Sequence, residues 1–210
     1  MDIRIEFEAK KQMQDVASEF KGKLSETEIK KSAAFTINVT MKRVTGLLRR
    51  NVRRDYTVKP KYLKRAINTK KKASSDSLFG VLSYDPNPIP LIGFKASKSG
   101  RKKFYAYKNT SKVTVEIKKG VKKIIEHAFM KQMPNGHQGV YMHGWYRQGG
   151  FKREDLKTSS GKYKITELKT TSPFAMFSSN KIKSDIENYV DSSIAGRYRA
   201  ILENKINRMK

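Results

Sequence analysis

A single long apolar stripe near the N-terminus is the feature that most constrains the fold. Apolar residues recur there at steps of three and four, at Ile29, Ala33, Ile37, Met41, Val44, Leu48 and Val52. This spacing predicts an α-helix of about seven turns with one side packed on a core. Ser25 and Glu28 have the spacing of a capping box, in which the serine is the N-cap. We therefore expect the helix to begin directly after Ser25.

The second half of this predicted helix is strongly basic. Residues 40–72 contain thirteen Lys or Arg residues and a single acid, Asp55. The basic residues fall off the apolar stripe. Arginine binds phosphate and carboxylate groups through two parallel hydrogen bonds, whereas lysine acts as a point charge. We predict that a basic surface binds nucleic acid through Arg43, Arg49, Arg50, Arg53, Arg54, Lys64 and Arg65. The alternative is that these charges only solvate the helix.

The charge of the whole chain points to a polyanionic partner. The 210 residues include 46 Lys and Arg against 19 Asp and Glu, a formal charge of +27. Self-repulsion at this charge opposes compaction, so either nucleic acid or an acidic neighbouring subunit is expected. The sequence contains no zinc-finger or RNA-recognition motif. Any nucleic acid is therefore expected to be bound through its backbone, without sequence preference and with strong salt dependence.

Shorter patterns predict the remaining elements. Residues 1–24 read as a short strand, in which Ile3, Ile5 and Phe7 alternate with charged residues, followed by a helix that Gly22 is expected to stop. A second short helix after Pro60 completes a basic helical part at residues 25–72. Residues 77–170 are rich in strand formers, including the alternating KVTVEIKK and a tight turn at Asn135-Gly136.

Three further segments complete this outline. Residues 89–94 (IPLIGF) are predicted to form a short strand, and KASKSGRKK, from Lys95, an exposed loop or hairpin tip. Ser184 and Glu187 form a second capping box, which predicts a C-terminal helix over residues 184–210. The predicted fold class is α+β: a single domain of residues 1–210 with a long basic amphipathic N-terminal helix, a central, mostly antiparallel β-sheet and a C-terminal helix.

The sequence offers few residues for catalysis or metal binding. There is no cysteine, and His127, His137 and His143 fit no zinc-binding spacing. A metal-dependent nuclease would use Glu116 with Asp85. However, six of the eleven glutamates, Glu167 included, precede a lysine by two positions, as Glu116 does. We therefore predict no catalytic residues, metal or cofactor. No apolar run approaches the ~20 residues that span a membrane.

The order of these segments resembles the minor tail protein Z family of prophages and tailed phages, the tail-completion proteins. The resemblance covers residues 25–210. It includes SAAFTINVTMKRV with the basic RRNVRRDYTVKPKYLKRAI, the IPLIGF segment, EHAFMKQMPNGHQGVYMHGWYR, the TTSPF exit and the C-terminal helix. Two regions depart from the family pattern: the first 24 residues, and the longer link that begins at His143.

The resemblance implies a structural, non-enzymatic protein that completes the head-proximal end of the tail for head-tail joining. The implied partners are other tail and neck proteins and further copies in a ring, with possible contact to packaged DNA. The protein would be part of the virion, assembled in the host cytoplasm, and membrane and small-molecule partners are not expected. The alternative function is a sequence-independent nucleic-acid-binding protein that acts through its basic helix.

Overall fold

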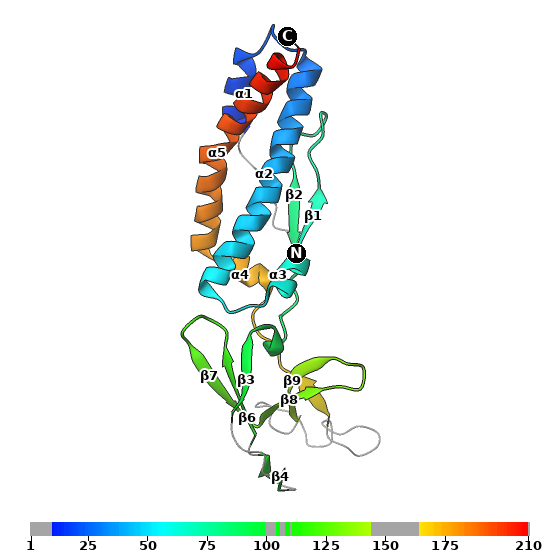
Figure 1. The fold of residues 1–210 in the computed structure, drawn as a ribbon, viewed down its shortest axis with the longest axis vertical. Coiled ribbons are helices and arrows are strands. Elements are labelled where there is room, and N and C mark those ends of the chain that lie inside the picture. Colours follow the sequence, from blue (N-terminus) through cyan, green and yellow to red (C-terminus); the bar gives the residue numbers. More distant parts are fainter. Residues whose placement is uncertain (1–9, 100–103, 106–107, 110, 144–163, 210) are drawn as a thin grey trace. The chain divides into compact units, whose positions relative to one another are not determined.

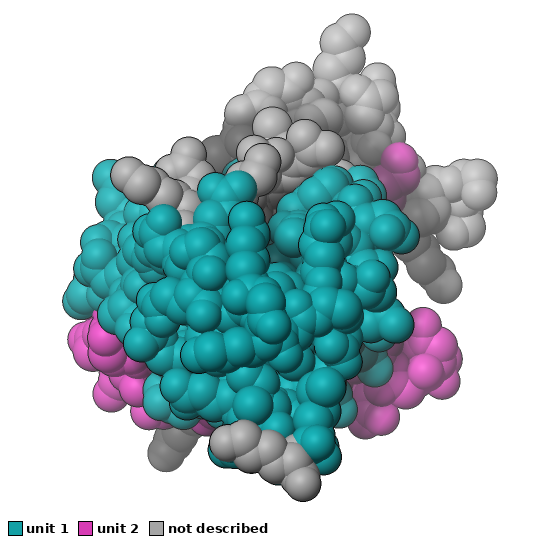
Figure 2. Space-filling model, turned by 90° about the horizontal axis from the view of Figure 1, so that it is seen from above, with its two compact units in different colours: residues 1–52, 63–86, 173–210 teal, residues 53–62, 87–172 magenta. Residues whose placement is uncertain are grey.

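The computed structural model describes residues 10–99, 104–105, 108–109, 111–143 and 164–209. The chain divides into two compact units, each built from separate stretches of sequence (Figure 2). Unit 1 comprises residues 1–52, 63–86 and 173–210, and unit 2 comprises residues 53–62 and 87–172. Helices dominate unit 1 and antiparallel strands dominate unit 2 (Figure 1). The predicted α+β class is confirmed, while the single-domain organisation stays a prediction.

Unit 1 is built around three helices that lie side by side: α1 (Lys10–Glu19), α2 (Glu26–Asp55) and α5 (Asn180–Asn207) (Figure 1). All seven residues of the predicted stripe on α2 are buried, so that prediction is confirmed. The opposing apolar side chains of α5 are Ile182, Ile186, Val190, Ile194, Tyr198 and Leu202. The Tyr198 hydroxyl donates a hydrogen bond to the Ile29 carbonyl at 3.0 Å, which joins α5 to α2 inside this core.

The start of α2 has the predicted capping box. The Glu28 backbone N–H donates to Ser25 Oγ at 3.3 Å, and the Ser25 N–H donates to Glu28 Oε2 at 3.2 Å. These bonds satisfy two backbone donors that a helix start leaves without partners. The preceding helix, α1, ends as expected before Gly22, whose φ of +87° suits glycine and ends the helical path. Two local signals therefore set the α1–α2 corner.

A β-hairpin packs beside α2. Strands β1 (Ile67–Lys71) and β2 (Val81–Tyr84) are antiparallel, and the Asn38 side chain on α2 bonds to both the N–H and the carbonyl of Ala73 in their connection. The helical part predicted for residues 25–72 is therefore wrong from Ile67 onward. Helix α3 (Pro60–Ala66) ends there because the backbone of residues 67–71 pairs with β2. Helix α4 (Pro173–Phe177) begins within the TTSPF exit, at its proline.

The described residues of unit 2 form three small antiparallel sheets. One has the order β3 (Lys95–Ser99), β6 (Lys112–Glu116) and β7 (Lys122–Glu126), and the second has the order β10 (Ile165–Glu167), β9 (Gln138–His143) and β8 (Ala128–Gln132). The third pairs β4 (Phe104–Tyr105) with β5 (Lys108–Asn109). The strand predicted at KVTVEIKK is confirmed as β6, and Gly136, at φ +79°, confirms the turn between β8 and β9.

Two predictions for unit 2 are wrong. The IPLIGF segment is not a strand, because Leu91–Gly93 form a 3₁₀ turn, η1, in which the Gly93 N–H donates to the Pro90 carbonyl at 2.7 Å. Prolines lack the N–H that a strand ladder needs, and they alternate through this region. Lys95–Ser99 forms strand β3 instead of a loop, since its backbone pairs with β6.

The C-terminal helix begins earlier than predicted. Helix α5 starts at Asn180 with Ser179 at the N-cap position, so Ser184 lies inside the helix and does not cap it. The apolar stripe explains the difference, because Ile182 is already part of the core. Glu187 forms an i,i+4 ion pair with Lys183 at 3.7 Å. The strand predicted at Ile3–Phe7 lies outside the described residues. None of the helices in the described ranges is long and apolar enough to cross a bilayer.

Replacing Ser25 with Ala should lower the free energy of unfolding by about 1 kcal/mol, because Glu28 N–H loses its acceptor. Urea unfolding followed by circular dichroism measures this change. Thr27→Ala is the matched control: Thr27 is exposed in the first turn of α2, outside the capping box. Equal stability of the two variants would contradict a capping role for Ser25.

Candidate nucleic-acid interface

The predicted basic residues of unit 1 form one surface, which we call the basic face. Its members are Lys42, Arg43, Arg49 and Arg50 on α2, with Lys64 and Arg65 on α3. On α2 they form two rows, since residues seven apart lie two turns along the same side. The buried stripe holds α2 against the core, so both rows point outward. All six side chains are exposed except that of Arg49, which is half-buried.

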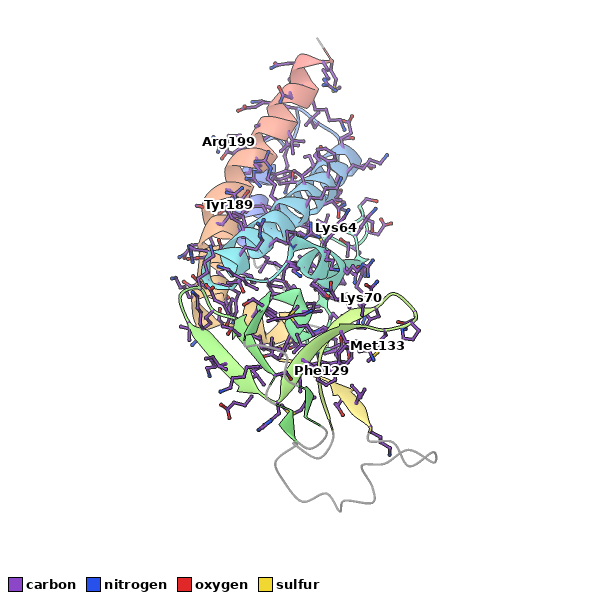
Figure 3. The ribbon with its side chains drawn as sticks, turned by 60° about the horizontal axis from the view of Figure 1, so that its bottom comes forward. Lys64, Lys70, Phe129, Met133, Tyr189 and Arg199 are labelled. Carbon is purple, nitrogen blue, oxygen red and sulfur yellow. The ribbon has the colours of Figure 1, made fainter. Side chains whose placement is uncertain are left out.

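Arg49 joins the two helices of the basic face. Its Nη2 donates a hydrogen bond to the Lys64 carbonyl at 3.4 Å. This bond places the cations of α3 beside those of α2, although 15 residues separate them in sequence. Figure 3 shows Lys64 on α3 in this position. The acceptor is a carbonyl in the last turn of α3, where carbonyl groups lack partners within the helix and a cation is favoured.

On its other side the basic face reaches α5. The Arg197 guanidinium donates a hydrogen bond to the Tyr189 hydroxyl and lies 5.1 Å from the centre of the Tyr189 ring. Arg43 on α2 also interacts electrostatically with this hydroxyl. Burial raises the pKa of the Tyr189 hydroxyl, but its interactions with Arg197 and Arg43 outweigh this effect, so the pKa falls below its usual value. Figure 3 shows Tyr189 on α5.

Acidic side chains balance the other half of α2 but leave the basic face largely uncompensated. Near the start of α2, Glu26 pairs with Lys30 at 2.6 Å and Glu28 pairs with Lys205 at 3.4 Å. Within the described ranges, no ion pair is formed by Arg50, Lys64 or Arg65. Their positive charge is available to an external anion.

Two predicted contact residues belong to the other compact unit. Arg53 and Arg54 occupy the last turn of α2, which belongs to unit 2. Both are exposed, and Arg54 Nε lies 3.6 Å from Asp55 Oδ1. Cations at this end of a helix complement its dipole, which gives these two arginines a role in stability. Nucleic-acid binding by any of the seven predicted residues stays a prediction.

Sequence reasoning missed the contribution of α5. Tyr189 and Arg197 are eight residues apart, a spacing that puts both on one side of a helix. The sequence therefore predicts that Tyr189 and Arg197 lie on the same side of a helix. It does not predict that Arg43 of α2 lies near them.

The carboxylates considered for a nuclease have other partners. The Glu116 side chain accepts a hydrogen bond from the Gly120 N–H at 2.9 Å and pairs with Lys95 at 3.3 Å, and the Gly120 bond is the main reason why its pKa is lowered. Glu167 Oε1 lies 2.7 Å from His137 Nε2. Asp85 belongs to unit 1, whereas Glu116 belongs to unit 2. Among the described residues, no three His, Asp or Glu side chains gather to hold a metal ion.

Unit 1 thus presents a cationic surface on a helical scaffold. Residues 14–208 match the family model of prophage minor tail protein Z (GPZ). The chain therefore belongs to the prophage minor tail protein Z family, which gives it a structural role in a phage tail and makes it a virion component. The resemblance inferred from the sequence is confirmed. No curated protein and no solved structure matches the chain.

Replacing Arg197 with Ala should raise the pKa of the Tyr189 hydroxyl, because the tyrosinate loses the cation that stabilises it most. Titration followed by NMR of chains with ¹³C-labelled tyrosine measures the shift. Arg43→Ala should raise the same pKa by less, since Arg43 contributes less than Arg197. A larger shift with Arg43→Ala would contradict this order.

Proposed function

We propose that this tail protein completes the head-proximal end of the tail and prepares it for joining to the head, without catalysing a reaction. The basic face is the observation that supports the proposal. It combines six cations on two helices, and three of them lack an ion pair within the described residues. A surface of this charge suits a place near the end of packaged DNA, where the duplex presents one negative charge per ~1.7 Å.

The partners follow from the same placement. We propose that several copies form a ring, because tail components generally follow the symmetry of the tail. Other tail and neck proteins would cover the rest of the surface. Assembly would take place in the host cytoplasm, before the tail joins the head.

Tails assembled without this chain should fail to join heads, whereas tails with it should show added density at the head-proximal end. Electron microscopy of both preparations, compared by difference density, makes the measurement. Complementation with the unaltered chain is the control and should restore joining. Tails that lack the chain and still join heads would remove the proposed function.

The alternative, a sequence-independent nucleic-acid-binding protein, draws on the same basic face. The two functions differ in where the charge is used, since a tail component meets DNA only in the assembled particle. A free-standing binder would hold DNA tightly as a purified protein at low salt. Measured binding to unrelated duplexes therefore separates the two functions when it is combined with the microscopy.

If the basic face contacts DNA, replacing Arg50, Lys64 and Arg65 together with Gln should weaken binding uniformly across sequences. The slope of log K against log salt should fall by about 0.9 for each phosphate contact that is lost. Fluorescence anisotropy with two unrelated duplexes measures both quantities.

The matched control replaces Lys23, Lys31 and Arg208 with Gln, which removes the same charge from exposed positions of unit 1 outside the basic face. A salt slope that falls equally in both triple variants would show that only net charge matters. That result would contradict a specific role for the basic face.

A further inference from the structure

Strand β7 offers an open edge in unit 2. In the part of the chain that the structure describes, β7 pairs with β6 and with no second strand (Figure 1). The backbone N–H and C=O groups on its outer side are therefore available to another strand. Two apolar side chains are also exposed here: Ile124 to 60% and Val121, just before the strand, to 51%. An edge of this kind is suited to pairing with an added strand.

The register with β6 defines the two faces of β7. Ile125 lies opposite Val113, which is buried, so Ile125 is on the core side of the sheet. Side chains alternate along a strand, so Lys122, Ile124 and Glu126 lie on the opposite face. That face therefore presents a cation, an apolar side chain and an anion in order along the edge.

The sequence of residues 2–8, DIRIEFE, has a matching pattern. Ile3, Ile5 and Phe7 alternate with charged residues, which is typical of a strand with one apolar face. Three of its four charged residues are acidic, whereas four lysines occupy residues 118–123 around the start of β7. The segment and the edge are therefore complementary in both charge and periodicity.

One antiparallel register places opposite charges together at both ends of β7. With Arg4 opposite Glu126 and Glu8 opposite Lys122, both pairs are of opposite sign, and Ile5 meets Ile125 on the core face. A slip of one residue would turn the apolar side chains of the segment to the charged face. A slip of two residues places either Asp2 or Glu6 opposite Glu126, which are like-charge pairs.

We propose that residues 2–8 of one copy add to the β7 edge of a second copy as an antiparallel strand in this register. The inference rests on the proposed function, which requires several copies in contact. Because the segment and the edge are different surfaces, each copy gives one and receives one, and repetition of this contact forms a ring when the rotation between successive copies closes. Glu126 remains available to Arg4, since its side chain is 63% exposed even while it pairs with Lys112.

Disulfide trapping tests the contact directly, because the chain has no cysteine of its own. Full-length chains carrying Glu6→Cys and chains carrying Ile124→Cys are mixed and mildly oxidised. These positions are opposed in the proposed register, so a heterodimer should form between them. In the control mixture, Ile5→Cys replaces Glu6→Cys and faces the other side of the sheet. It should give at least about tenfold less heterodimer.

Three results would overturn the proposal. The first is equal yield from the two mixtures, which would indicate random collision. The second is preferential self-linking of Ile124→Cys chains, which would indicate that two β7 edges pair with each other. The third is a disulfide that forms within a single chain carrying both cysteines while the mixture gives none. That last result would place the segment on its own copy.

A charge exchange provides an independent test. The Ile124→Cys chain is given two further changes, Lys122→Glu and Glu126→Lys. It should then form no disulfide-linked heterodimer with the Glu6→Cys chain, because Arg4 would face Lys and Glu8 would face Glu. Combining this variant with Arg4→Glu and Glu8→Arg in the partner should restore it. Circular dichroism confirms that each variant is folded. Failure of restoration between folded variants would contradict the register.

The two proposals can fail separately. If trapping fails but tails still show head-proximal density from this chain, the tail role stands and the β7 contact does not. If the disulfide forms in purified protein but tails without the chain join heads normally, the contact stands and the tail role does not.

Discussion

Burial of the apolar stripe of α2 is the interaction on which unit 1 depends. Val44 and Val52 are fully buried, and full burial of such a side chain contributes about 1.5–3 kcal/mol. The Tyr198 hydroxyl bond to Ile29 satisfies a polar group inside this core. Once one side of α2 is fixed in this way, its other side must face outward. The basic face is therefore a consequence of core packing, since cations cannot share the buried side without partners.

The two halves of α2 have different electrostatic roles. In the first half, Glu26 and Glu28 lie near the positive end of the helix dipole and pair with Lys30 and Lys205. In the second half the cations accumulate; Arg49 bonds to the neutral Lys64 carbonyl, and Arg43 interacts with the Tyr189 hydroxyl. Charge that a fold leaves uncompensated in this way favours an anionic neighbour. This arrangement agrees with a protein whose charge is balanced by assembly.

Much of unit 1 could be predicted because its signals are local. The stripe, the capping box at Ser25 and the stop at Gly22 each depend on residues within a few positions of one another. The errors arose where a distant partner decided the outcome. Residues 67–71 form a strand because β2 pairs with them. Helix α5 begins at Asn180, before Ser184, and its residue Ile182 is already buried in the core. Ser184 and Glu187 have the spacing of a capping box, but both lie inside α5, which begins at Asn180.

The sequence by itself determined the long helix, its basic side and membership of the tail protein family, because periodicity, charge and segment order are written along the chain. Only the tertiary structure decided which cations act together. Lys64 joins Arg49 through a bond across 15 residues, and Arg197 meets Tyr189 beside Arg43, whereas Arg53 and Arg54 fall in the other unit. Neighbours in space depend on how helices pack, and the side chains that set this packing lie far apart in sequence.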